Sequence, residues 1–155
     1  MRLAEHERGV ILRLGRLHRV AGPGSVFVIP LIDRLIRVDL RPFTLAVELP
    51  AVTSKDHAVF AARLEASCCV LQPERAVVGV EDYRSAVQEL LVAIVREAAA
   101  QMDAVELQAD PVRLGRAIKK IANEATLAWG VDVQAVSVLE MDPSPHGPRD
   151  TPGAG

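Results

Sequence analysis

The 155-residue sequence predicts an α+β domain, in which two main helices cover one side of a curved, mostly antiparallel sheet. Apolar and polar residues alternate in short runs through the first half of the chain, as they do in half-buried strands. Two later stretches instead repeat their apolar residues with the period of an α-helix, and alternation returns over residues 131–141. We therefore expect the sheet to combine the N-terminal half of the chain with this last strand.

Proline and glycine separate the predicted strands of the first half. The segment Gly22-Pro23-Gly24 predicts a turn, because glycine permits positive φ angles and proline stiffens the backbone beside it. Pro30, Pro42 and Pro50 interrupt the alternation further along the chain. The predicted strands cover residues 10–17, 26–29, 35–40, 43–49 and 59–71.

Both main helices have recognisable starts. Asp82 can cap the first helix, and apolar residues then recur three or four positions apart over residues 83–98. The second helix begins at Asp110-Pro111, an acidic cap followed by proline at the first helical position. It ends at Gly130, because glycine readily adopts the left-handed conformation that closes a helix. Pro73 predicts a further short helical turn ahead of both.

One domain accounts for most of the chain. We expect residues 1–6 to be an N-terminal tail, residues 7–141 the folded domain, and residues 142–155 a disordered tail rich in proline and glycine. No stretch approaches the roughly 20 apolar residues that a spanning helix needs. The N-terminus also lacks the apolar core of a signal peptide. The sequence therefore predicts a cytoplasmic protein without a transmembrane segment.

Charge is distributed unevenly along the chain. The net charge is -2, yet residues 1–41 contain eight arginines and four acidic residues, a local balance of +4. This basic end includes the apolar segment 26–38, so the two features could together contact an anionic membrane surface or a partner. The plainer interpretation is that the arginines keep the outer face of a sheet soluble and the segment forms two core strands. The candidate contact residues are Arg13, Arg16, Arg19, Phe27, Ile29, Leu31 and Ile32.

No pattern in the sequence predicts catalysis, a cofactor or a metal site. Ser54 and Lys55 are neighbours on an extended segment, where their side chains diverge, so a polar turn explains them better than a nucleophile and its base. The four histidines and two cysteines lack the spacing of metal ligands, and there is no phosphate-binding glycine loop. We therefore predict a protein that is not an enzyme.

The second helix has a basic side, which consists of Arg113, Arg116, Lys119 and Lys120. A nucleic-acid interface would combine such a side with interleaved aromatic residues for stacking, and no base-reading motif accompanies it. We expect a solvated helix face and no nucleic-acid partner, with an anionic lipid surface or an acidic partner as the alternatives.

Several short segments occur in an order that resembles the stomatin/prohibitin/flotillin (SPFH, band 7) superfamily, and its stomatin (slipin) branch in particular. The segments are ERGVILRLGR (7–16), GPG (22–24), IPLID (29–33), VDLR (38–41), TSKD (53–56), VEDYRSA (80–86) and AWGVDV (128–133). Each segment is short, but their shared order over residues 5–141 is specific.

The resemblance implies a membrane-associated scaffold without enzymatic activity that self-associates into rings or higher oligomers. It also implies a peripheral position at the inner face of the plasma membrane, with a membrane protein of the NfeD type or a membrane protease as partner. Relatives usually have an N-terminal hydrophobic anchor and a long C-terminal coiled-coil helix. Here six residues precede Glu7, and Asp142-Pro143 follows the last strand, where proline cannot continue a helix. The alternative function is a soluble adaptor that binds one protein partner without membrane contact.

Overall fold

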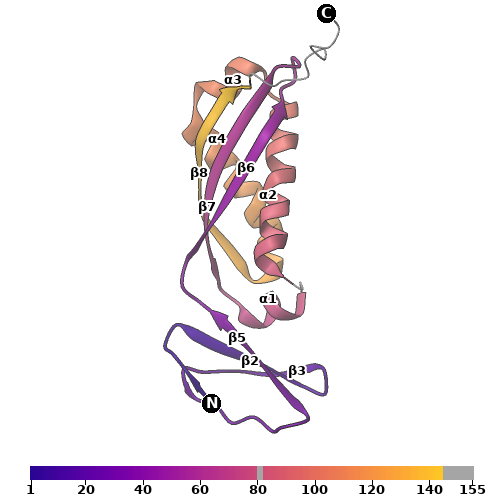
Figure 1. The fold of residues 1–155 in the computed structure, drawn as a ribbon, viewed down its shortest axis with the longest axis vertical. Helices are drawn as coiled ribbons and strands as arrows, with labels where there is room; N and C mark the ends of the chain where they lie inside the picture. The colour runs from indigo at the N-terminus through magenta and orange to yellow at the C-terminus, as the bar shows by residue number, and fades with distance from the viewer. Residues whose placement is uncertain (80–81, 145–155) are drawn as a thin grey trace, which may run out of the picture.

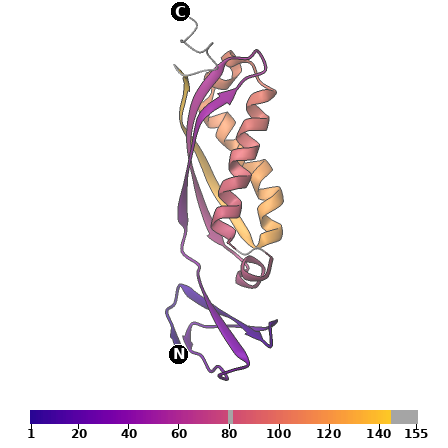
Figure 2. The ribbon, with the colours of Figure 1, turned by 45° about the vertical axis from the view of Figure 1, so that its right-hand side comes forward.

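The computed structural model describes residues 1–79 and 82–144, and it has two parts that follow one another along a long axis (Figure 1). A small β-rich part contains the N-terminus, and a larger part combines a three-stranded antiparallel sheet with helices on one side of it (Figure 2). The predicted α+β class is therefore confirmed. The strands of the first half nevertheless divide between separate sheets, which the sequence does not predict.

The small part consists of five strands in two sheets. They are β1 (Arg2–Leu3), β2 (Glu7–Arg13), β3 (Arg16–Ala21), β4 (Gly24–Ser25) and β5 (Asp33–Asp39). The main sheet has the order β3-β2-β5, and β1 pairs with β4. Leu3, Ile11, Ala21 and Val26 form its own small core. Residues 1–6, expected as a tail, thus contribute both a strand and a buried leucine.

The larger part is built on β6 (Phe43–Thr53), β7 (Val59–Val70) and β8 (Val131–Pro143), which pair in that order. Its helices are α1 (Pro73–Gly79), α2 (Tyr83–Ala100), α3 (Ala104–Ala109) and α4 (Pro111–Thr126), followed by the 3₁₀ turn η1 (Leu127–Trp129). Strand β6 runs past Pro50 because a bulge between Leu49 and Val52 takes the proline out of the ladder. Of the predicted C-terminal tail, residues 142–143 belong to β8 and residues 145–155 lie outside the described residues.

The two parts separate at the connection between β5 and β6. Strand β5 pairs along its whole length with β2, whereas β6 pairs with β7, so in the described part of the chain no ladder joins the two sheets. Pro42 lies in this connection and has no N–H to donate. In place of ladder pairing, the chain makes a local turn here, because the Asp39 carboxylate accepts a hydrogen bond from the Arg41 N–H at 2.9 Å.

Helices α2 and α4 bury their apolar sides against the sheet, as the sequence periodicity predicts. The predicted caps are present: Asp82 accepts from the Arg84 N–H at 3.1 Å, and Asp110 accepts from the Arg113 N–H at 3.1 Å. Val10 and Val38 of the small part belong to the same core as these helices, so apolar burial continues across the junction. Among the described residues, no helix is both long and apolar enough to cross a membrane.

Candidate membrane-contact site

Exposed apolar side chains gather at the free end of the small part. The turn between β2 and β3 and the segment 26–32 both lie there, far from the end of β8 (Figures 1 and 2). Leu14 is 76% exposed, Phe27 79% and Leu31 103%, and Ile29 is also exposed. We call these four residues the apolar tip. Several large apolar side chains exposed at one end of a molecule are a feature of surfaces that contact membranes or proteins.

Leu14 joins the tip through the geometry of the hairpin. Leu14 and Gly15 are the two turn residues, and both have positive φ, at 52° and 81°. This is the arrangement of a two-residue hairpin turn. The Leu14 N–H donates to the Ile32 carbonyl at 2.8 Å, so the turn lies against segment 26–32. The alternation of residues 10–17 predicts a strand that runs through Leu14, so this exposed residue is absent from the predicted contact set.

Asp33 holds the segment in shape. Its carboxylate accepts two hydrogen bonds from the Arg13 guanidinium, at 2.8 and 3.1 Å, and a third from the Ile29 N–H at 2.9 Å. The Asp33 N–H donates to the Ile29 carbonyl at 2.9 Å, which closes an arch over residues 29–33. The arch presents Leu31, whose φ is 78°, to solvent. The hydrogen bonds from Arg13, then that from Ile29, lower the pKa of Asp33 from its ordinary 3.8 to about 2.

The arginines of this end differ in what they contact. Arg13 forms an ion pair with Asp33, and the Arg19 guanidinium donates a hydrogen bond to the Phe27 carbonyl at 2.6 Å. Arg37 pairs with Glu7 and Arg41 with Asp39. Within the described residues, the arginines of residues 1–41 without a carboxylate partner are Arg2, Arg8, Arg16, Arg19 and Arg34. The local positive charge therefore remains available after the ion pairs form.

The structure brings the predicted contact residues to one end of the molecule. Arg13 and Arg16 are direct partners across the β2–β3 hairpin, and Arg19 reaches Phe27. Ile29 and Leu31 project from the arch, whereas Ile32 is half-buried and contributes its carbonyl to the hairpin turn. Arg13 shapes the arch, and Arg16 is the exposed cation nearest to it along the hairpin.

Asp33→Asn is expected to loosen the arch and to lower stability at neutral pH. A carboxylate with a depressed pKa stabilises the fold above its ordinary pKa of 3.8, and that contribution is lost as the pH falls towards about 2. The difference in unfolding free energy between wild type and variant should therefore be present at pH 7 and shrink between pH 3.8 and about 2. Urea unfolding at several pH values measures it. A difference that stays constant over that range would contradict the ion-pair explanation.

The segment Ser54–Asp56 forms the polar turn that the sequence favours. The Ser54 hydroxyl donates to the Asp56 carboxylate and accepts from the Ala58 N–H at 3.0 Å. Asp56 also accepts from the Ala104 N–H at 3.1 Å, which ties the turn to the start of α3. Ser54 is buried, and its hydroxyl is occupied by these bonds, so it does not face a substrate-sized space.

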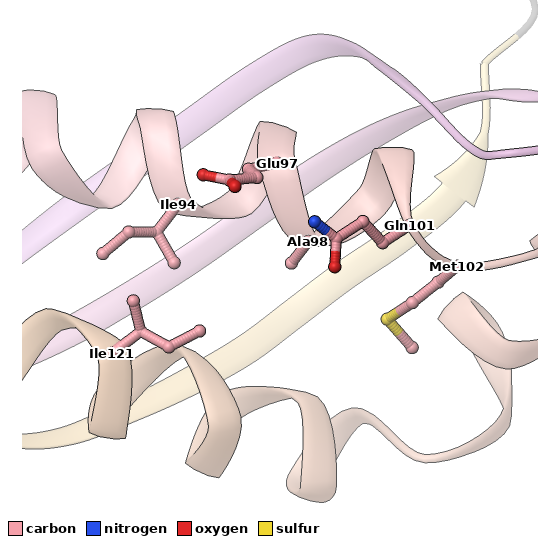
Figure 3. Close-up of a pocket in the computed structure, with 6 residues that line it drawn as sticks. All are labelled: Ile94, Glu97, Ala98, Gln101, Met102 and Ile121. Atoms are coloured by element: carbon pink, nitrogen blue, oxygen red, sulfur yellow. The ribbon is translucent and has the colours of Figure 1, made fainter.

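A shallow groove of about 330 Å³ lies between α2 and α4 (Figure 3). Ile94 of α2 and Ile121 of α4 face each other across it, and Met102 lies at one end. Its polar groups are the side chains of Glu97 and Gln101, and no nucleophile with a neighbouring base lines it. The groove therefore offers apolar contact between the two helices.

Comparison with known proteins is consistent with this description. The sequence profile of the SPFH domain / Band 7 family matches residues 2–146. A protein of Archaeoglobus fulgidus is 34% identical over 138 residues, which are 89% of this chain and 55% of that protein. A stomatin homologue of Pyrococcus horikoshii is 32% identical over 138 residues, 89% of this chain and 52% of that protein. Mouse stomatin-like protein 1 is 30% identical over 133 residues, 86% of this chain and 33% of that protein.

The chain spans about half the length of the two archaeal relatives. The matched region covers both the β-rich part with its apolar tip and the sheet with its helices. The chain therefore belongs to the SPFH domain / Band 7 family and is similar to its stomatin members.

Proposed function

We propose that the chain is a non-enzymatic stomatin-like scaffold or regulator that acts peripherally at a membrane surface. The observation that carries the proposal is the apolar tip, formed by Leu14, Phe27, Ile29 and Leu31, at the end of the molecule where several arginines have no carboxylate partner within residues 1–79 and 82–144. Family membership supports the same role. In this proposal the tip enters the headgroup layer, and the arginines attract anionic lipid at the inner face of the plasma membrane. Self-association would place several tips on one surface.

The expected affinity of a single tip is modest. Each basic residue near an anionic surface contributes about 1 kcal/mol, and that attraction weakens with salt. A leucine or phenylalanine side chain contributes roughly 1.5–3 kcal/mol when it is fully removed from water, and less when it is partly inserted. The arch fixed by Asp33 lowers the cost of insertion, because the segment is already ordered before contact. Binding should therefore need both the apolar side chains and the positive charge.

Flotation with vesicles tests this directly. Wild type should float with vesicles that contain phosphatidylserine at low salt, and much less with pure phosphatidylcholine or at high salt. Leu31→Ser and Phe27→Ser should each lower the binding constant for these vesicles by about tenfold, which corresponds to roughly 1.4 kcal/mol of lost apolar contact. Their side chains are exposed, so neither change should destabilise the fold.

Val105→Ser is the matched control. Val105 is also 79% exposed, but it lies on α3 in the larger part of the molecule (Figure 1). This variant should float like wild type. Equal binding by wild type, Leu31→Ser and Phe27→Ser would refute the tip as the contact, and so would binding that is the same to neutral and anionic vesicles.

A second candidate function is an adaptor that binds a protein partner without membrane contact. The groove between α2 and α4 favours it, because Ile121 is exposed there and the apolar side chains of Ile94 and Met102 also line the groove (Figure 3). A membrane protein of the NfeD type or a membrane protease is the partner class to test first. An adaptor of this kind would float with none of the vesicles above, so the same experiment separates the two functions.

A further inference from the structure

We propose that copies of this chain associate head to tail, with the basic side of α4 in one copy lying on the uncovered acidic face of the β6-β7-β8 sheet in the next. This inference rests on the self-association included in the proposed function and assigns the two surfaces that carry it. Neither surface includes a residue of the apolar tip, so lipid contact and assembly can be tested apart.

The face of the sheet that points away from the helices is acidic and built from small side chains. Residues that lie side by side on the three strands form rows across this face. The rows are Ala46–Glu65–Ser137, Glu48–Arg63–Glu140 and, on β7 and β8 alone, Ala61–Asp142. Glu48, Glu65, Glu140 and Asp142 are exposed, and Arg63, 3.5 Å from Glu140, is the single cation in these rows. Among the described residues, no element covers this face (Figure 2).

A hollow interrupts the same face where the strands bulge. It has a volume of about 400 Å³, and Glu48, Pro50, Ala61, Arg63 and Glu140 line it. Register shifts lie beside it in both ladders, between Leu49 and Val52 and between Arg63 and Leu64. Arg63 already pairs with Glu140 here, but Glu48 has no ion pair among the described residues, so its carboxylate and the small side chains around the space suit the end of a lysine or arginine side chain from another molecule.

The complementary surface is the basic side of α4. Arg113, Arg116 and Lys120 are exposed, and Lys119 is half-buried. None of the four takes part in an ion pair within residues 1–79 and 82–144. An acidic partner is one of the alternatives that the sequence predicts for this side of the helix. The acidic sheet face of a second copy is a partner of this kind.

The spacing of the charges agrees on the two surfaces. Arg113 and Lys120 are seven residues apart, which is about 10 Å along a helix. Glu65 and Asp142 lie two cross-strand rows apart, which is about 13 Å along a strand, with Glu48 and Glu140 between them. Three basic side chains can therefore meet three rows of acidic side chains at once. Charge complementarity of this kind steers association and fixes its orientation.

The sheet edges are less available for association than its face. The Asn123 side chain bonds both backbone groups of Val133 on β8, and Gln108 donates to the Met141 carbonyl. On β6, Gln88 donates to the Ala46 carbonyl at 2.9 Å. Helix side chains thus occupy backbone groups that an added strand would need. The two charged surfaces lie on opposite sides of one molecule, so each copy can use both, and the contact repeats towards a ring or a filament.

Charge reversal tests the pairing. The helix variant carries Arg113→Glu, Arg116→Glu and Lys120→Glu, and the sheet variant carries Glu48→Lys, Glu65→Lys and Glu140→Lys. Wild type should self-associate in sedimentation velocity at low salt and dissociate at high salt. Each variant alone should associate at least about tenfold more weakly, because its two surfaces now repel each other. Circular dichroism confirms that each variant is folded.

An equimolar mixture of the two variants gives the decisive result. Every contact between unlike variants again joins opposite charges, so the mixture should regain wild-type association. A mixture that stays monomeric would overturn the proposal, as would variants that associate like wild type. A wild type that stays monomeric would also overturn it and would leave the sheet face to a basic partner of another kind. Flotation of the tip variants with vesicles tests membrane binding independently of this assembly, so the two proposals can fail separately.

Discussion

Gly130→Ala is expected to lower the free energy of unfolding by about 2–4 kcal/mol, from backbone strain and overpacking together. Gly130 has a φ of 72°, which costs any other L-residue energy. A Cβ atom there would also lie 2.3 Å from the Gln72 carbonyl oxygen. The Gly130 carbonyl accepts hydrogen bonds from Leu71 and Gln72, so movement to relieve the clash would disturb the end of β7. Thermal unfolding should shift by about 2–4 °C per kcal/mol for a chain of this size.

Gly15→Ala separates strain from overpacking. Gly15 has a φ of 81°, but a Cβ atom there would have no neighbour within 4 Å. The variant should therefore lose only the strain energy of about 1–2 kcal/mol. If Gly130→Ala is no more destabilising than Gly15→Ala, the close approach of Gln72 does not limit the site, and the turn before β8 adjusts freely.

Local signals explain why much of the fold could be predicted. Asp82 and Asp110 cap the starts of α2 and α4 as predicted, whereas α4 ends at Thr126 and Gly130 closes the 3₁₀ turn η1 that follows it. The period of the apolar residues likewise identifies the buried sides of α2 and α4. These features depend on residues close together in the chain, so a single sequence contains them.

Features that depend on distant pairing could not be predicted in this way. Alternation shows that a segment is a strand, but it does not show which strand lies beside it. Strand β2 pairs with both β3 and β5, and this choice produces the separate small sheet. Two residues also form β1 only because β4 lies opposite them. The short helix α3 has too few residues to show a period.

The candidate site shows the same division. The local excess of arginine and the apolar segment 26–38 indicated the candidate region in the sequence. The residues predicted from them lie at one end of the molecule. The role of Arg13 could not be foreseen, because its partner Asp33 is distant in sequence. Leu14 was missed because strand alternation and a two-residue turn look alike until the register is known. Sequence therefore located the region, and the tertiary pairs determined which side chains remain exposed.

Asn123→Ala is expected to lower the unfolding free energy by about 2–3 kcal/mol, because it strips two buried backbone groups of their partners. The Asn123 amide donates to the Val133 carbonyl at 3.0 Å and accepts from the Val133 N–H at 2.8 Å. Val133 is fully buried, so water cannot readily replace the lost bonds. Alanine has the better helix propensity, which offsets part of the loss. Urea unfolding measures the net effect.

Hydrogen exchange tells whether the loss arises at the sheet edge. The Val133 amide should exchange faster in Asn123→Ala, whereas the neighbouring control Glu124→Ala should be nearly neutral, since Glu124 is exposed and has no ion pair among the described residues. Unchanged protection of Val133 would contradict the role of Asn123. Because the Asn123 amide bonds a strand as a neighbouring strand would, its removal also opens the β8 edge. The variant should therefore aggregate on heating in a way that high salt does not prevent, unlike the charge-dependent association proposed for the sheet face.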